Sequence, residues 1–204
     1  MNRSASQFSG SKALRWLIVI FLSVMATGCS KKESAIESLK SRNITISAEN
    51  LGVFASQGDL ATVKLLVDAG VDVNAKNSRG GNALTDASWS GKQEVASYLL
   101  DSKADLASAS VGQPSPLSAA VNQKQEATAL MLLERGANPN TVDPAGSTPL
   151  IEASWQGSLP LVKALLAKGA NASYKRPDSA FTALKAAGNR TEIVLLLKAA
   201  GATE

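Results

Sequence analysis

The stretch that decides the fold is TPLIEASWQGSLPLVKALLAKGANAS, residues 148–173. A short apolar segment in it ends at Gly157, and a second apolar segment, over residues 161–166, is followed by Gly169. Each glycine stands just past the last apolar position, where a residue with left-handed backbone can close a helix without a Cβ penalty. The stretch therefore predicts two short helices, each ended by a glycine.

The same pattern recurs along the chain at a fixed step, which equals the separation of Leu51 and Leu84 in the sequence. Two columns of leucine and one of Asp or Asn keep this step: Leu51, Leu84, Leu117 and Leu150; Leu66, Leu99, Leu132 and Leu165; Asp72, Asp105, Asn138 and Asn171. Several columns in phase are the signature of an internal structural repeat. The pattern predicts five units, over residues 48–76, 77–109, 110–142, 143–175 and 176–204.

These units resemble the ankyrin repeat. Thr148-Pro149-Leu150 and Ser115-Pro116-Leu117 are similar to the T-P-L-H start of that repeat, and residues 136–140 (GANPN) are similar to its G-A-D-x-N end. The resemblance covers about residues 48–202. It implies an all-α solenoid of about five repeats, in which paired antiparallel helices are connected by β-turn or hairpin loops.

The chain departs from this pattern in two places. Lys103 and Lys124 replace glycines, and a non-glycine residue held in a left-handed conformation costs about 1 kcal/mol. The junction of the second and third repeats is therefore predicted to be the softest in the stack. The last unit is shorter between its helices, and its apolar run, residues 193–197, is interpreted as a C-terminal cap.

Residues 1–28 have the pattern of a cleaved signal peptide. Residues 1–15 are polar and carry three positive charges, and the apolar run WLIVIFLSVM follows at residues 16–25. A helix of ten to twelve apolar residues spans roughly 15 to 18 Å, well short of the roughly 30 Å hydrocarbon core of a bilayer. A permanent transmembrane anchor is therefore the poorer interpretation.

The end of the leader, Ala26-Thr27-Gly28-Cys29, resembles the lipobox of bacterial lipoproteins, although Ala26 stands where Leu is usual. The resemblance implies that Cys29 is alkylated by diacylglycerol and becomes residue one of the mature chain. Ser30 after it implies release to the outer membrane of a Gram-negative cell, facing the periplasm. Residues 29–47 would then be the lipidated cysteine and a tether with one capping helical turn. The alternative is an incidental cysteine in an ordinary signal peptide.

Composition argues against an enzyme. The 204 residues include no His and one Cys, so neither a Ser-His-Asp nor a Cys-His nucleophile can form, and we predict no cofactor or metal site. Asp86 and Glu152 share a column but should lie roughly 20 Å apart, too far to act on one bond. Three of the 21 Lys and Arg lie in the leader, so the rest of the chain is nearly neutral against its 17 Asp and Glu. This balance gives no electrostatic reason to expect nucleic-acid binding.

The groove and the loop tips remain free for binding, because the leucine columns of such a stack form its core. Trp89 and Trp155 occupy equivalent positions two repeats apart, and Trp is enriched in binding hot spots. The predicted partner-binding residues of this groove are Trp89, Ser90, Asn122, Gln123, Trp155 and Gln156, and those of the loop tips are Lys76, Ser78, Arg79, Val142, Pro144 and Lys175. The alternatives are partly exposed packing for the tryptophans and solvated turns for the loop tips.

Together these features predict a membrane-anchored periplasmic module that binds a protein partner through its groove. Two versions differ in biology. The module is either a scaffold or protector of a periplasmic enzyme, or an immunity-type inhibitor of a toxic effector, such as a lipase, delivered to the periplasm. A structural envelope protein is a third, more remote alternative.

Overall fold

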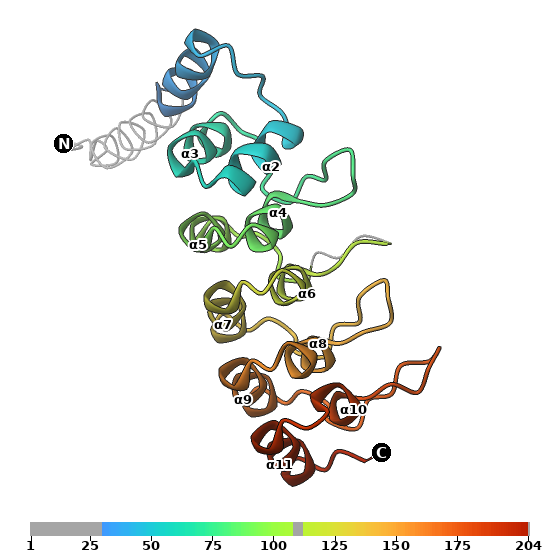
Figure 1. Ribbon diagram of the computed structural model, residues 1–204. Helices are drawn as coiled ribbons and strands as arrows, with labels where there is room; N and C mark the ends of the chain where they lie inside the picture. Colours follow the sequence, from blue (N-terminus) through green and yellow to red (C-terminus); the bar gives the residue numbers. More distant parts are fainter. Residues whose placement is uncertain (1–29, 108–111, 204) are drawn as a thin grey trace, which may run out of the picture.

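The computed structural model describes residues 30–107 and 112–203, in which five successive helix pairs stack in one direction (Figure 1). The pairs are α2 (Ala48–Gln57) with α3 (Leu60–Asp68), α4 (Ala83–Trp89) with α5 (Gln93–Asp101), α6 (Pro116–Asn122) with α7 (Glu126–Glu134), α8 (Pro149–Gln156) with α9 (Leu159–Ala167), and α10 (Ala183–Ala187) with α11 (Thr191–Ala199). Each pair falls within one predicted unit. The expected all-α solenoid of five repeats is confirmed.

The helices form two rows. Figure 1 shows α2, α4, α6, α8 and α10 in one row and the second helix of each pair in the other. The loops between repeats project from the side of the first row. The only pairing of strand type in the described residues is a single antiparallel bridge between Lys175 and Thr182, in the loop before α10.

Local sequence sets the helix boundaries. Thr148 and Ser158 begin α8 and α9, and each side chain accepts a hydrogen bond from a backbone N–H in the first turn. Gly157 then ends α8 with a φ of 79°. Lys103 and Lys124 hold the same left-handed backbone without being glycine, with φ of 71° and 57°. The strain expected at the second and third repeats is thus present in the backbone.

The two leucine columns form the core. All eight of their side chains are at most 1% exposed. Burying a leucine side chain contributes about 1.5 to 3 kcal/mol relative to leaving it in water, so these columns are a large part of the stabilisation. The C-terminal run behaves less uniformly than expected, because Ile193 and Leu197 are buried whereas Leu195 is 63% exposed.

The segment before the first repeat is more ordered than the predicted tether with one helical turn. Residues 30–41 form a helix, and its Ala35 and Leu39 side chains are buried in the core. The Lys31 ammonium lies 2.8 Å from the Asp68 carboxylate at the end of α3. Ile36 and Leu39 alone predicted only one helical turn. Ala35 lies one turn before Leu39 and widens the apolar stripe of this helix. Cys29 and the leader lie outside the described residues.

An asparagine after the second helix connects neighbouring repeats. Asn74 donates from Nδ2 to the Lys103 carbonyl (3.1 Å), and its Oδ1 accepts from the Asp105 amide (2.8 Å). Asn140 makes the same pair of bonds to the next repeat, with the Gly169 carbonyl and the Asn171 amide. Ser173 donates to the Gly201 carbonyl at 2.7 Å. The equivalent position between the second and third repeats is Ala107, whose side chain cannot make these bonds.

We predict that Ala107→Asn stabilises the protein. The repeat step places the new amide opposite the Gly136 carbonyl and the Asn138 amide, and we expect a gain of about 0.5 to 1.5 kcal/mol in the free energy of unfolding. Urea unfolding followed by circular dichroism measures it. The matched control, Asn74→Ala, should lose a comparable amount. An Ala107→Asn variant no more stable than wild type would contradict the assignment of this junction as the weakest.

Candidate functional site

Two large exposed side chains mark the ends of first helices. Trp89 is the last residue of α4 and is 46% exposed, and Trp155 is the next-to-last residue of α8 and is 61% exposed. A tryptophan presents a large apolar surface that a partner can cover, and tryptophan is enriched at binding hot spots. The predicted equivalence of the two positions places both indoles on the side of the stack that carries the loops.

Each indole lies toward the loop of the following repeat. The Trp155 ring meets the Phe181 ring edge to face, with centroids 6.4 Å apart and an interplanar angle of 63°. Trp89 lines a pocket together with Gln113 and Pro114 of the third repeat. The Trp155 ring therefore packs on one edge, and both indoles remain exposed over much of their surface.

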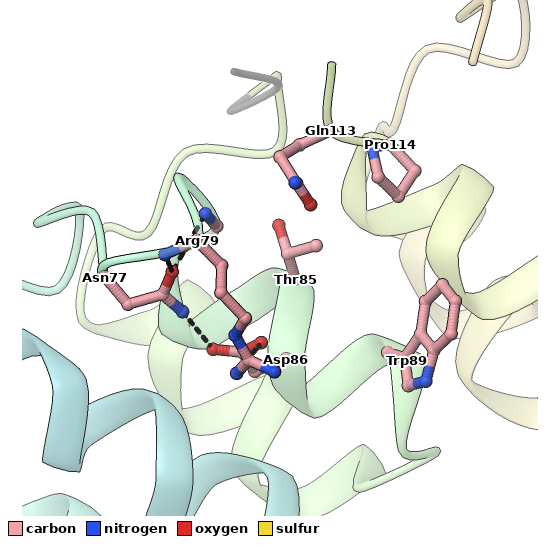
Figure 2. Close-up of a pocket in the computed structure, with 8 residues that line it drawn as sticks. Asn77, Arg79, Thr85, Asp86, Trp89, Gln113 and Pro114 are labelled. Atoms are coloured by element: carbon pink, nitrogen blue, oxygen red, sulfur yellow. Dashed lines mark hydrogen bonds and ion pairs between the residues drawn. The ribbon is translucent and has the colours of Figure 1, made fainter. Parts of the chain in front are cut away.

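The pocket beside Trp89, which we call the Trp89 pocket, has a volume of about 290 Å³ (Figure 2). Its lining residues are Asn77, Arg79, Gly81, Thr85, Asp86, Trp89, Gln113 and Pro114. Asn77 organises one wall, because its Oδ1 accepts from the backbone amides of Arg79 (3.0 Å) and Gly81 (3.1 Å). Its Nδ2 donates to Asp86 Oδ2 at 2.8 Å. The loop and α4 are thereby held in a fixed relation.

Asp86 is the partly buried anion of this pocket. Its side chain is 15% exposed, and its Oδ1 lies 3.5 Å from Nη2 of Arg79, a residue whose own side chain is 67% exposed. Burial raises the pKa of the Asp86 carboxyl above its ordinary value, and the nearby charge of Glu49 acts in the same direction. The Arg79 charge and the Asn77 hydrogen bond favour the ionised form. The carboxylate is thus desolvated and only loosely paired.

Two of the predicted groove residues connect neighbouring units. Gln156 Nε2 donates to the Val121 carbonyl at the end of α6 (2.7 Å) and to Glu152 Oε1 (3.1 Å). Asn122 Nδ2 donates to Asp143 Oδ2 at 3.2 Å. These side chains hold one repeat against another, which limits what they can offer a partner. Ser90 and Gln123 directly follow α4 and α6 as their C-cap residues.

The loop-tip residues are exposed, and several also have neighbours within the chain. The exposed members are Lys76, Ser78, Arg79, Val142, Pro144 and Lys175. The Ser78 amide donates to Glu49 Oε2 at 2.9 Å, and Lys175 forms the bridge with Thr182. Val142 is 53% exposed, a large value for an aliphatic side chain.

Sequence reasoning missed the residues that complete the Trp89 pocket. Gln113 and Pro114 precede α6 and gave no signal of their own, and Asp86 was considered only as a catalytic acid. Gly52 on α2 could have pointed to it, because a Cβ at that position would collide with the Asp86 carboxylate. Within residues 30–107 and 112–203, no three His, Cys, Asp or Glu side chains are grouped as a metal site would require. No helix in those residues has the length and hydropathy needed to cross a bilayer.

We predict that Gln156→Ala lowers the free energy of unfolding by about 1 kcal/mol, because the Val121 carbonyl loses its side-chain donor. The matched control is Gln123→Ala, one repeat earlier in the same column and exposed, which should change stability by less than about 0.5 kcal/mol. Chemical denaturation of the two variants beside wild type measures the difference. Equal effects of the two substitutions would show that the hydrogen bond of Gln156 does not stabilise the stack.

Comparison with known proteins agrees with this geometry. Residues 31–110 and 117–203 match the sequence profile described as ankyrin repeats (3 copies). The chain is 30% identical over 142 residues to a putative ankyrin repeat-containing protein of Treponema pallidum (strain Nichols), covering 69% of this chain and 48% of that protein. It is 37% identical over 106 residues to the B-cell lymphoma 3 protein homolog of Mus musculus, covering 52% of this chain and 24% of that protein. The chain therefore spans about half or less of the length of these relatives. Because the ankyrin-repeat profile matches most of its residues, the chain belongs to the ankyrin-repeat family.

Proposed function

We propose that this chain is a lipoprotein anchored through Cys29 in the outer membrane, facing the periplasm, and that its groove binds a protein partner. Ankyrin repeats are protein–protein binding modules and are typically non-enzymatic, which supports the binding role. The partner in this proposal is a periplasmic enzyme that the module scaffolds or protects.

The observation that carries the proposal is the pair of exposed indoles. Trp89 and Trp155 are 46% and 61% exposed at equivalent ends of α4 and α8. Trp offers a large contact area with little rotamer entropy to lose, and side chains of this kind dominate the energetics of protein interfaces. Two such side chains, two repeats apart on one side of a solenoid, suit a partner that lies along the stack.

The location rests on the leader. Its three positive charges, its apolar run and the sequence Ala26-Thr27-Gly28-Cys29 support lipidation and export. Several acyl chains on one residue give durable anchoring, because each buried methylene contributes about 0.8 kcal/mol.

We predict that the Trp89→Ala/Trp155→Ala double variant loses its partner. Full-length protein and the double variant are used as baits in detergent-solubilised envelopes, and bound proteins are identified by mass spectrometry. Loss of two indoles that the partner covers should weaken binding by more than about 100-fold, since hot-spot truncations cost about 2 kcal/mol or more each. Leu195→Ala is the matched control, because Leu195 is 63% exposed on α11 and should retain the partner.

Two further arms of the same experiment separate the parts of the proposal. Capture of the same proteins by wild type and by the double variant would contradict the groove hypothesis and favour a structural or loop-mediated role. Activity of the captured enzyme, assayed with and without the module, distinguishes a protector from an immunity-type inhibitor. Wild type grown with a labelled fatty acid should incorporate the label and Cys29→Ser should not, and labelling of both or of neither would contradict lipid anchoring.

A further inference from the structure

The lining of the Trp89 pocket holds one cation, Arg79, and one anion, Asp86. A second carboxylate, that of Glu49, lies outside the lining but within the electrostatic reach of Arg79. Its Nη2 is 3.5 Å from Asp86 Oδ1, and its charge also acts on Glu49, which accepts a hydrogen bond from the Ser78 amide. One guanidinium thus acts on two carboxylates, that of Asp86 in the pocket and that of Glu49 beside it.

Arg79 is a loose partner for these acids. Its side chain is 67% exposed, and its contact with Asp86 is at the long end of an ion pair. Exposed ion pairs contribute little to stability, because solvent screens them and two side chains must be held in one geometry. Another cation can therefore take the place of the Arg79 guanidinium beside Asp86. Asp86 itself cannot leave, because Asn77 and α4 hold it in place.

The opposite side of the pocket suits a cation as well. Trp89 lies one helical turn after Asp86 on α4, so the two side chains lie on one face of the helix. The face of an indole ring attracts ammonium and guanidinium groups. Figure 2 shows Thr85 and Gln113 above Asp86 with Trp89 to the right, and the oxygens of the Thr85 and Gln113 side chains can accept hydrogen bonds. A volume of about 290 Å³ has room for one long side chain.

We propose that the Trp89 pocket receives a lysine or arginine side chain of the protein partner. The cationic group lies between the Asp86 carboxylate and the Trp89 indole and takes the place of the Arg79 guanidinium. This inference rests on the proposed function only in taking the cationic side chain to come from the protein partner. The chemistry of the pocket stands on its own and is testable without the partner.

The equivalent position two repeats later lacks this chemistry. The repeat step places Ala145 where Arg79 would be, and Glu152 accepts from Gln156. Trp155 meets Phe181 in place of Gln113 and Pro114. The second indole is therefore an apolar contact and serves as an internal control.

The test is a titration of full-length protein, labelled with 5-fluorotryptophan and held in detergent micelles. The ¹⁹F resonances of Trp89 and Trp155, the two tryptophans that follow Cys29, are assigned with Trp→Phe variants. The probe is acetyl-Gly-Arg-Gly-amide, and the matched probe has citrulline in place of arginine, which keeps the shape and removes the charge. We expect the arginine peptide to shift the Trp89 resonance with an affinity about tenfold greater than the citrulline peptide, and to leave Trp155 unchanged.

Three variants make the test decisive. Asp86→Asn should weaken binding of the arginine peptide about tenfold, to the level of citrulline, and Glu152→Gln should have no effect. Arg79→Ala should strengthen binding several-fold, because it removes the internal competitor, and a folding defect cannot produce such a gain. Equal binding of both peptides, loss of binding in Arg79→Ala, or no shift up to about 50 mM peptide would overturn the proposal.

The two proposals fail separately. A Trp-dependent partner captured from envelopes, with no response to the arginine peptide, would leave the binding module intact and remove the cation pocket. A response to the arginine peptide without a captured partner would support the cation pocket and contradict the proposed binding module.

Discussion

Each helix pair buries its leucines against the pairs on either side, and the rest of the structure depends on that contact. A single pair of short helices cannot bury its apolar face alone, so each repeat is stable only within the stack. The helix over residues 30–41 closes the first end of this core with Ala35 and Leu39. The free energy of unfolding is therefore approximately a sum of contributions from each repeat and from each interface between neighbouring repeats. A weak interface lowers the stability of the stack at that point.

The junction predicted to be the weakest and the Trp89 pocket lie at the same place. Ala107 replaces the connecting asparagine between the second and third repeats. Lys103 after α5 and Lys124 between α6 and α7 hold left-handed backbone in these two repeats. The Trp89 pocket has one wall in the second repeat and the other, Gln113 and Pro114, in the third. Any opening at the junction would widen the pocket. A partner bound in the Trp89 pocket would contact both the second and the third repeat, and it would stabilise the stack at this junction.

Sequence predicted the parts of the molecule that obey the period. The leucine columns, the left-handed positions that end helices, and the exposure of Trp89 and Trp155 follow from one repeat step, because equivalent positions in a solenoid have equivalent environments. Features outside the period were missed. The helix over residues 30–41 has no counterpart in any repeat.

The Trp89 pocket was missed for a related reason. It combines residues that do not recur, and its geometry depends on the close approach of α2 and α4 at Gly52. Gln156 was predicted as a groove residue from its place in the same column as Gln123, yet its Nε2 donates to the Val121 carbonyl and so also connects two repeats. The position of a residue in a repeat column predicts where its Cα lies, but it does not predict the hydrogen-bond partner of its side chain.

Site-specific photo-cross-linking in living cells tests the central claim, that the loop side of the stack binds a protein, most directly. A photoreactive phenylalanine analogue would replace Trp89 or Trp155 in the groove, and Lys64 or Leu195 on the second-helix row as controls. The account predicts that both groove positions cross-link to one and the same protein, whereas the control positions do not. Cross-links from Lys64 and Leu195 alone, or from no position, would contradict it.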